Sequence, residues 1–590
     1  MDNKKDSTRA QFEQEAAALK KIIQELIDTN QAPTAAQLLE QYALLNPDDP
    51  DLTQIRNTLY PDGNPTGIDT QNEEIPTKYK LLNEIETIFI LAGITTKRIG
   101  YTDSVLRKIK LMEEKWNYKP LLLTCIHNID QRKTLKWLET AGDGQNALNP
   151  DTRVLNVYEY FQKSYADGLK NKAVFIDTDK ETQPEEGIEV KKIYDGYMAS
   201  LRTEQHIKNG KPHKDLVYDD WGYLNYIREY NPEKKDVFDV KYYTTEGKLC
   251  IKALFRPTEN GIEHERILVY DDNEKITAQC ANSAELAAVC LNKIIKEEQN
   301  RKFYLLVYED GLMSRAARQV ENKNNNVAKS IVVHSIFTTD AYDPKSKPQK
   351  FYKYLCENPE EFDGIIMLTN NAAEDFKNRY GNKDSLFVVP HPYPFAIDKS
   401  SFEKRDNLKA VTIARLDPVK LLDFAIEIFA LVVKEIPKAN FEIYGRGNEE
   451  ERLKKLISKL GVEKNVKLMG YTDSPLTVFN NGILSIMTSV AEGFGLTLIE
   501  SISNGCPAFA FDIKYGPSEI IDDGKTGYLI PRFNKEKYAE QIIKYLKDKN
   551  KQKTMSENCY KAAHKFSTEK FLENWYKMTK TLYERKIEHR

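Results

Sequence analysis

The chain has 590 residues, of which 41% are apolar and 30% charged, and its 86 basic and 89 acidic side chains leave a net charge of -3. This is the composition of a globular protein with sizeable hydrophobic cores, and the length predicts about three or four domains. The near balance of charge argues against a protein drawn to nucleic acid by its overall field.

The cysteines and the apolar runs exclude further classes. The 7 Cys are scattered and odd in number, with no CxxC or Cys/His cluster, so neither a disulfide framework nor a zinc site is indicated. The stretch MDNKKDSTRAQFEQE lacks the apolar core of a signal peptide, and no run approaches the roughly 18 apolar residues of a membrane span. We therefore expect a cytoplasmic protein, and contact with the inner face of the cell membrane stays open.

Residues 1–80 are predicted to form a helical module and a linker. QFEQEAAALKKIIQELI has apolar residues at helical spacing, and TAAQLLEQYALLNPDDPDLTQIRNTLY predicts a helix, a Pro/Asp turn and a second helix. This hairpin is similar to a tetratricopeptide-like unit, and one such unit is too few for a solenoid. PDGNPTGIDTQNEEIP then follows as a linker by composition.

Residues 81–180 together with 296–400 are predicted to form one parallel-sheet domain. TIFILAG, the helix VLRKIKLMEEKW and the strand KPLLLTCIH give a β-loop-α-β opening, and the strand pattern resumes with KFYLLVYEDG, AKSIVVHS, FDGIIMLT and SLFVVPHP. Residues 181–295 contain short alternating strands separated by turns such as TEGK and DDNEK. They are predicted to be an inserted, antiparallel β-rich domain.

Residues 401–590 are predicted to form a second parallel-sheet domain with closing C-terminal helices. Its strands are KAVTIARL, NFEIYGRG, NVKLMGY, GILSIMTS, CPAFAFD and GYLIP, and helical patterns lie between them. The fold class is thus α/β, with two doubly wound domains that face a cleft. Ligands of such folds bind beyond the carboxyl ends of the strands.

The stretch VAEGFGLTLIESISNG joins the end of a predicted strand to the start of a helix. Gly493 and Gly495 let the backbone approach a ligand closely, and the free N–H groups of the helix start suit a phosphate. Glu492 and Glu500 accept hydrogen bonds, as sugar or ribose hydroxyls require. A nucleotide-sugar has hydroxyls at both ends and phosphates between them. Alone, the E-x7-E spacing is better explained by a Glu492 that caps a turn and a Glu500 on a solvated helix face.

TIARLDPVK places Arg415 and Lys420 at a second strand end and helix start of the same domain. Two cations at this edge can hold a diphosphate and offset the charge of a leaving group. YGRG, GYTD and EGFGLTLIE follow in that order.

These ordered motifs, over about residues 408–531, resemble glycosyltransferase family 4, the retaining GT-B enzymes. AFDIKYGPSEIIDDGKTGYLI and TRVLNVYEYFQ are similar to a narrower group. It comprises the wall teichoic acid α-glycosyltransferases, which act on poly(glycerol-phosphate) or poly(ribitol-phosphate), and the serine-rich-adhesin glycosyltransferases of Gram-positive bacteria. The resemblance covers roughly residues 85–585 and implies the GT-B fold with a β-rich insertion in the first domain.

The resemblance implies roles for the charged residues. Arg415 and Lys420 would hold the nucleotide diphosphate, Glu492 the hydroxyls of the donor sugar, and Glu500 the ribose hydroxyls. His334, at the end of SIVVH, matches the family's histidine near the donor sugar.

The remaining donor contacts are also implied by the resemblance. Backbone N–H groups would contact the sugar and phosphates at Gly493, Phe494, Gly495, Leu496 and Thr497. The backbone of Tyr471 would contact uracil. Gly100 aligns with the glycine-rich acceptor and phosphate loop, although the relatives tend to have paired glycines where this chain has Ile99 and Gly100. His391 occupies a place where many relatives have Asn and is interpreted as hinge structure.

The implied reaction is retaining transfer of glucose or GlcNAc from a UDP-sugar, with no cofactor and no metal. Because the second Glu is expected at the ribose, a front-face mechanism follows more naturally than double displacement. The first-choice acceptor is a hydroxyl of a polyol-phosphate polymer. Ser/Thr hydroxyls of a surface adhesin are the alternative, and an inactive sugar-binding partner subunit stays open.

Two surfaces of the predicted fold suggest further partners. A basic cluster follows the first strand: Lys97, Arg98, Arg107, Lys108 and Lys110. It fits a polyanion, an anionic membrane or a solvated helix face. The edges of the β insertion would permit a homo-oligomer.

Overall fold

The computed structural model describes most of the chain beyond residue 74. The described residues are 20–21, 75–94, 100–129, 134–135, 138–139, 148–149, 151–163, 187–194, 201–218, 224–231, 238–244, 246–259, 261–297, 302–343, 345–393, 399–472 and 474–588. The chain divides into two units, Met1–Glu74 and Ile75–Arg590. Apart from Lys20 and Lys21, which are helical, the predicted N-terminal helices and linker lie outside the described residues.

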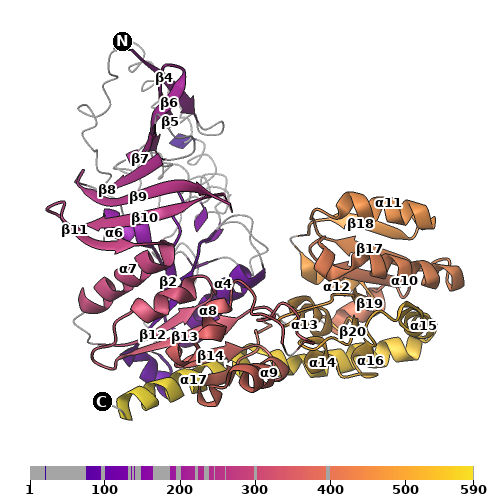
Figure 1. Cartoon of the computed structure of the whole chain (residues 1–590). Coiled ribbons are helices and arrows are strands. Elements are labelled where there is room, and N and C mark those ends of the chain that lie inside the picture. Colours follow the sequence, from indigo (N-terminus) through magenta and orange to yellow (C-terminus); the bar gives the residue numbers. More distant parts are fainter. Residues whose placement is uncertain are drawn as a thin grey trace. The chain divides into compact units, whose positions relative to one another are not determined.

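The first lobe of the second unit is built on a parallel sheet with the strand order β15-β14-β13-β12-β1-β2-β3 (Figure 1). Every residue of β1 is buried, as expected for a parallel strand with both faces covered by helices. The strands are β1 (Ile85–Leu91), β2 (Leu121–Thr124), β3 (Arg153–Asn156), β12 (Phe303–Tyr308), β13 (Val327–Val333), β14 (Gly364–Met367) and β15 (Leu386–Val388).

The last helix of the chain, α17 (Thr568–Glu588), packs on this first sheet. The ring centroids of Trp575 and Phe89, which lies on β1, are 5.6 Å apart. Tyr583 in turn donates to Glu84 at 2.6 Å. The C-terminal helix therefore completes the core of the first lobe. The other helices and 3-10 turns of this lobe are η1 (Thr77–Glu84), α4 (Gly100–Trp116), α6 (Val157–Gln162), α7 (Ser283–Glu297), η4 (Met313–Gln319), α8 (Lys353–Glu357), η5 (Pro359–Glu361), α9 (Asn370–Tyr380) and η6 (Lys383–Ser385).

The insertion is an antiparallel sheet in which β4 to β11 are paired in sequence order, so its edges are β4 and β11. It shares one hydrophobic core with the first lobe. The strands are β4 (Ile188–Tyr194), β5 (Leu201–Lys208), β6 (Lys211–Tyr218), β7 (Leu224–Tyr230), β8 (Phe238–Tyr243), β9 (Leu249–Thr258), β10 (Gly261–Tyr270) and β11 (Ile276–Cys280).

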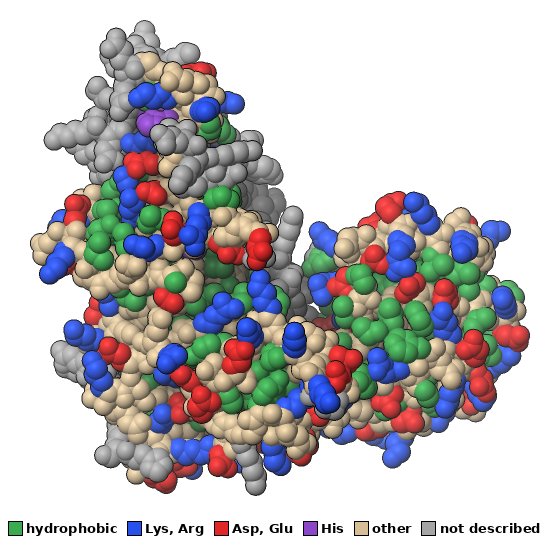
Figure 2. All heavy atoms as spheres, in the orientation of Figure 1, with side chains coloured by type: hydrophobic (Ala, Val, Ile, Leu, Met, Phe, Trp, Pro, Cys, Tyr) green, Lys and Arg blue, Asp and Glu red, His purple; other side chains and the backbone are tan. Residues whose placement is uncertain are grey.

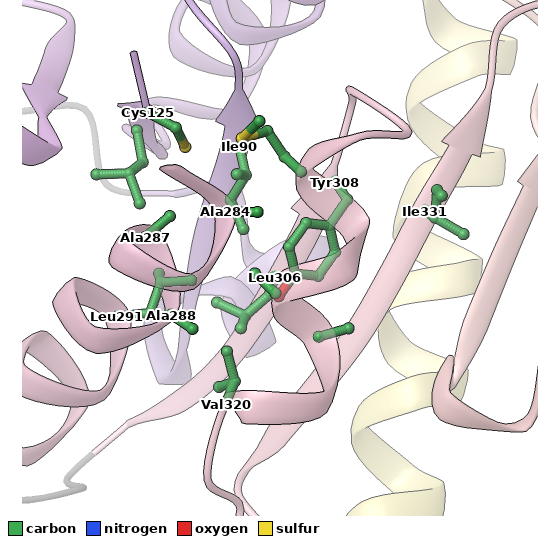
Figure 3. Close-up of a cluster of buried hydrophobic side chains, with 14 of the residues drawn as sticks. Ile90, Cys125, Ala284, Ala287, Ala288, Leu291, Leu306, Tyr308, Val320 and Ile331 are labelled. Carbon is green, nitrogen blue, oxygen red and sulfur yellow. The ribbon is translucent and has the colours of Figure 1, made fainter. Parts of the chain in front are cut away.

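Helix α7 differs from the expectation that residues up to 295 are β-rich. Its small apolar residues pack toward Ile90, Leu306 and Tyr308 of the first sheet (Figure 3). The physical reason is the helical spacing of these buried residues: Ala284, Ala287, Ala288 and Leu291. The strands of the insertion thus end at Cys280, and α7 belongs to the first lobe.

The second lobe is a parallel sheet with the order β18-β17-β16-β19-β20-β21. The order reverses between β16 and β19, which is the switch point where doubly wound folds bind ligands. Its strands are β16 (Lys409–Ile413), β17 (Asn440–Tyr444), β18 (Val466–Gly470), β19 (Leu484–Met487), β20 (Ala508–Phe511) and β21 (Gly527–Ile530). Its helices and turns are η7 (Lys399–Lys404), η8 (Pro418–Lys420), α10 (Leu422–Glu435), α11 (Glu450–Leu460), α12 (Pro475–Asn481), α13 (Leu496–Ser503), α14 (Pro517–Ile520), α15 (Lys535–Leu546), α16 (Lys549–Ala563) and η9 (His564–Phe566).

Charge is mixed over the surface. On the face seen in Figure 2, Lys and Arg side chains are interspersed with Asp and Glu. This agrees with the small net charge of the chain. Among the described helices, none combines the length and the hydropathy that a bilayer-spanning segment requires.

Arg405 is a buried cation that holds the second lobe together. Its guanidinium donates to the carbonyls of Gly482 at 3.1 Å and Gly505 at 2.8 Å, and also to that of Asn504. Arg405→Met would remove the guanidinium donor from these carbonyl oxygens, so we expect the free energy of unfolding to fall by about 3–5 kcal/mol. Urea denaturation measures this. Lys404→Met, a change at the exposed neighbouring residue, is the control and should change the free energy of unfolding by less than about 0.5 kcal/mol. An equally small change in both variants would contradict the role of Arg405.

Candidate active site

A cavity of about 340 Å³ lies at the switch point of the second lobe. The ends of β16 and β19, the loops that follow them and the start of α13 form most of its wall, and the first lobe contributes His334, Leu368 and His391. The second lobe contributes nearly all of the residues predicted to bind the donor. They are Arg415, Lys420, Glu492, Gly493, Phe494, Gly495, Leu496 and Thr497.

An ion pair between Lys420 and Glu492 forms part of the cavity wall. Lys420 Nζ donates to Glu492 Oε1 at 2.7 Å, and the two side chains are only 18% and 12% exposed. The Thr488 hydroxyl, just after β19, donates to the carbonyls of Lys420 and Leu421 at 2.9 Å. This ties the two cavity loops to each other. Because both charges are largely removed from water, their attraction exceeds that of a surface pair.

Arg415 lies at the open side of the cavity. Its side chain is 71% exposed, and its guanidinium pairs with Asp417 at 2.8 Å. Asp417 also accepts from the backbone of Val419 at 3.1 Å and so caps the turn η8. The guanidinium is therefore held by a partner in its own loop and is accessible to an anion.

The glycine of YGRG serves a close backbone approach. Gly445 has φ +147°, and a Cβ there would overlap the carbonyl oxygen of Ala414. The backbone of Leu416 meanwhile donates to the carbonyl of Arg446 at 3.0 Å. The loop after β17 thus fixes the segment that leads from β16 to Arg415.

The glycines of EGFG have different tasks. Gly495 is the N-cap of α13 and has φ +99°. Residues with a side chain rarely adopt this backbone conformation. Gly493 packs against the first lobe: a Cβ there would overlap the carbonyl oxygen of His334 and lie 2.6 Å from the Cα of Ser335. Gly493 is therefore the point where the two lobes meet backbone to backbone beside the cavity.

His334 is held from behind by two buried charges. Its Nε2 lies 2.7 Å from Glu309 Oε2, and Glu309 Oε1 accepts from Lys108 Nζ. Burial raises the pKa of Glu309, but Lys108 and His334 outweigh this and bring the pKa below its ordinary value. Burial lowers the pKa of His334, with the hydrogen bond to Glu309 as the opposing cause. The imidazole is therefore neutral beside an ionised carboxylate at neutral pH.

His391 also lines the cavity, which its interpretation as hinge structure missed. Its ring stacks on that of His334 with centroids 5.3 Å apart, and its edge meets Phe494 at 5.7 Å. Burial, and then the positive groups His334, Lys108 and Arg107, lower its pKa well below the usual 6.5. The His391 ring is therefore neutral at neutral pH, and it packs between His334 of the first lobe and Phe494 of the EGFG loop.

The buried neutral state of His391 predicts a pH dependence of stability. Between the usual pKa of 6.5 and its lower folded value, the unfolded state binds the proton and the folded state does not. Stability therefore falls as the pH drops below about 6.5, by at most about 1.4 kcal/mol per pH unit for this group. We expect His391→Asn to flatten the pH dependence of urea denaturation between about pH 6.5 and 5. An unchanged slope in the variant would contradict a neutral His391.

The structure does not bring three predicted residues into the cavity wall. Tyr471 is 56% exposed, and the guanidinium of Arg446 stacks 4.1 Å above its ring. Glu500 lies on α13 but does not line the cavity. Gly100 is the first residue of α4, and Ile99 lies outside the described residues. The roles of Tyr471, Glu500 and Gly100 stay predictions.

The predicted basic cluster is wrong for two of its members. Lys108 and Arg107 are buried, and Lys108 pairs with Glu309, so neither belongs to a solvated helix face. Lys110 lies 3.8 Å from Glu114 on the same helix. Lys97 and Arg98 lie outside the described residues. The reason is that Glu309, far away in sequence, attracts a lysine into the core.

A second cavity, of about 230 Å³, shares Glu492 with the first. Arg532, which lines it, stacks 3.9 Å above the ring of Tyr342 from the other lobe. Among the described residues, no group of His, Cys, Asp and Glu side chains has a metal-binding arrangement.

Comparison with known proteins shows which sequences this chain resembles. Residues 395–562 match the family described as glycosyl transferases group 1. The chain is 26% identical to the poly(glycerol-phosphate) alpha-glucosyltransferase of Bacillus subtilis, over 86% of this chain and 77% of that protein. It is 27% identical to the poly(ribitol-phosphate) alpha-N-acetylglucosaminyltransferase of Staphylococcus aureus, over 73% of this chain and 87% of that protein. It is 24% identical to the GtfA subunit of a peptide N-acetylglucosaminyltransferase of Streptococcus gordonii, over 65% and 74%.

Solved structures have the same fold. The crystal structure of TarM matches with a TM-score of 0.69 and 23% identity, over 84% of this chain and 98% of that chain. The GtfA/B complex matches with a TM-score of 0.65 and 18% identity, over 85% and 100%. The predicted fold class, two Rossmann-like domains of GT-B type with an antiparallel insertion, is confirmed.

Proposed function

We propose that this chain, whose residues 395–562 have the glycosyltransferase group 1 domain, is a retaining glycosyltransferase of family 4. It transfers glucose or GlcNAc from a UDP-sugar to a hydroxyl of a polyol-phosphate polymer. One observation carries the proposal: Arg415, Lys420, Glu492 and the amides at the start of α13 line one cavity with His334 from the opposite lobe. An activated sugar needs this combination of cations, hydrogen-bond acceptors and helix-start donors.

The cavity divides the donor into an anionic and a hydroxylated part. Arg415 exchanges its partner Asp417 for the diphosphate, and Lys420 reaches it from the pair with Glu492. The N–H groups at the start of α13 face the same anion. Glu492 then accepts hydrogen bonds from the sugar hydroxyls, and Glu500 takes the ribose. No metal takes part, since the two cations offset the charge of the leaving group.

The reaction proceeds on one face of the sugar. The bond between the anomeric carbon and the diphosphate breaks, and the acceptor oxygen forms its bond on the same side. The departing diphosphate takes the proton of the acceptor hydroxyl while Arg415 and Lys420 stabilise its negative charge. A double displacement would need a second carboxylate near the anomeric carbon. Glu492 is the one carboxylate among the described residues that line the larger cavity.

The names of the relatives support the substrate classes. Two of them are a poly(glycerol-phosphate) glucosyltransferase and a poly(ribitol-phosphate) N-acetylglucosaminyltransferase, so either sugar is a candidate donor. The second candidate function is O-linked transfer of GlcNAc to Ser or Thr of a protein. It is favoured by the match to the GtfA subunit of a peptide glycosyltransferase.

The test is an acceptor and donor panel. UDP-glucose and UDP-GlcNAc are each incubated with poly(glycerol phosphate), poly(ribitol phosphate) or a Ser-rich peptide, and UDP release and product mass are read. We expect a sugar adduct on one of the polymers. An adduct on the peptide alone would favour the second function, and donor binding without any UDP release would identify a sugar-binding partner subunit.

A further inference from the structure

We propose that Lys108 and Glu309 are positioning residues for His334, and that they hold its imidazole as the tautomer whose acceptor nitrogen, Nδ1, serves a hydroxyl in the cavity. The proposal rests on the proposed function in one respect: the hydroxyl is taken to be that of the donor sugar. Neither residue touches the substrate, because both lie behind the wall of the cavity.

The two charges are among the most deeply buried in the described structure. The side chain of Lys108, on α4, is 2% exposed, and that of Glu309, directly after β12, is 0% exposed. The Lys108 ammonium also lies 5.5 Å from the ring centre of Trp575 and 5.7 Å from that of Phe89. A buried ion pair is seldom kept for stability, since an apolar pair of similar size often does as well. Glu309 of this pair contacts a histidine that lines the cavity, so the pair can orient that histidine as well as contribute to stability.

The carboxylate divides its oxygens between two donors. Oε1 of Glu309 accepts from Lys108, and Oε2 lies 2.7 Å from Nε2 of His334. An ionised carboxylate only accepts hydrogen bonds, so Nε2 must carry the proton. The ring is neutral, and Nδ1 therefore has a lone pair. Lys108 contributes by keeping Glu309 ionised at this depth.

The ring has little other freedom. Its own backbone N–H donates to the Tyr352 hydroxyl at 2.9 Å, and the His391 ring stacks on it at an interplanar angle of 15°. Besides Glu309 and Lys108, the charged or titratable groups around it are Asp310 and His391. The Glu309 carboxylate lies within hydrogen-bond distance of Nε2, and this contact favours Nε2 as the nitrogen that donates.

The test uses a charge-neutral double variant, Lys108→Met with Glu309→Gln. Changing Glu309 alone would leave the buried Lys108 ammonium without its carboxylate partner. The double change removes both charges and approximately keeps the volume of the two side chains. We expect kcat/KM for hydrolysis of the UDP-sugar to fall about 10- to 100-fold, by analogy with the loss when the carboxylate partner of a metal-bound histidine is removed. Lys409→Met with Glu442→Gln is the matched control. Lys409 Nζ and Glu442 Oε1 are 3.0 Å apart and form a partly buried ion pair between β16 and β17, and neither residue lines the cavity. This control should leave kcat/KM unchanged.

A double-mutant cycle separates positioning from general damage. If the pair acts through His334, its removal in a His334→Gln background costs nothing further. If the two losses simply multiply, the pair has another role and the proposal is overturned.

The tautomer itself provides a readout that needs no activity. With ¹⁵N-labelled histidine, and the His334 signal assigned by its loss in His334→Gln, we expect the Nε2–H tautomer in the wild-type protein and its loss in the double variant. An Nδ1–H tautomer in the wild-type protein would overturn the proposal. Should the wild-type protein release no UDP, the proposed function fails, while this spectrum still decides whether Glu309 fixes the ring.

Discussion

Replacement of Lys420 by Ala is expected to lower kcat for the UDP-sugar by about 10²–10³-fold, the typical loss when one electrostatic contact to a developing charge is removed. The ammonium lies 2.7 Å from Glu492 in the cavity wall, where it is largely shielded from water. Its removal takes away a cation that we propose for the leaving diphosphate, and it also removes the ion-pair partner of Glu492. Steady-state kinetics with UDP detection measures the effect.

Arg415→Ala should lower kcat by the same order, since this guanidinium is the second cation that we propose for the diphosphate. Because the side chain is 71% exposed and pairs with a neighbour in its own loop, the melting temperature should hardly change. Lys434→Ala, an exposed change in the last turn of α10, is the control for both variants. Turnover near the wild-type level in both Lys420→Ala and Arg415→Ala would refute the assignment of the diphosphate site.

Gly493→Ala is expected to have the second large effect. The added Cβ would overlap the carbonyl of His334 and lie 2.6 Å from the Cα of Ser335. Both neighbours are backbone and cannot yield like a flexible side chain, so the two lobes must move apart. A misplacement of about 1 Å at a reacting centre costs on the order of 10²-fold in rate, and we expect kcat/KM to fall by that factor.

Two further measurements on Gly493→Ala serve as controls, namely UDP binding and the melting temperature. The groups proposed to hold the diphosphate all lie on the second lobe, so the dissociation constant for UDP, measured by calorimetry, should stay within about threefold of the wild-type value. The melting temperature should also be kept, since the clash is relieved by lobe movement. If hydrolysis of the UDP-sugar is unchanged, the closed contact at Gly493 is not needed for catalysis.

The arrangement of the cavity was largely predictable from the chain. Arg415 and Glu492 follow two strands of one parallel sheet, and the carboxyl ends of such strands meet at one edge. The pattern therefore placed distant residues together without a structure. The task of Gly493 was only half predicted, because a glycine reserved for a ligand and one reserved for the opposite lobe look the same in a sequence.

Lys108 and Glu309 show what the sequence could not reveal. Lys108 stands in VLRKIKLMEEKW beside other basic residues, and such a run normally indicates a solvated helix face. Its burial depends on Glu309, which directly follows β12 and comes after the insertion in the sequence. His391 was missed for a related reason, since only the packing of the two lobes brings its ring against His334 and Phe494.

The anomeric configuration of the transferred sugar is the most direct test of the central claim, that two facing lobes pass a sugar from UDP to a hydroxyl of a polyol-phosphate polymer on a single face. The protein is incubated with a UDP-α-sugar and poly(glycerol phosphate) or poly(ribitol phosphate), and the product is analysed by proton NMR spectroscopy. The account predicts an α-linked sugar on the polymer and one UDP for each linkage formed. A β-linked product, or an absence of any linked sugar with either donor and either polymer, would contradict it.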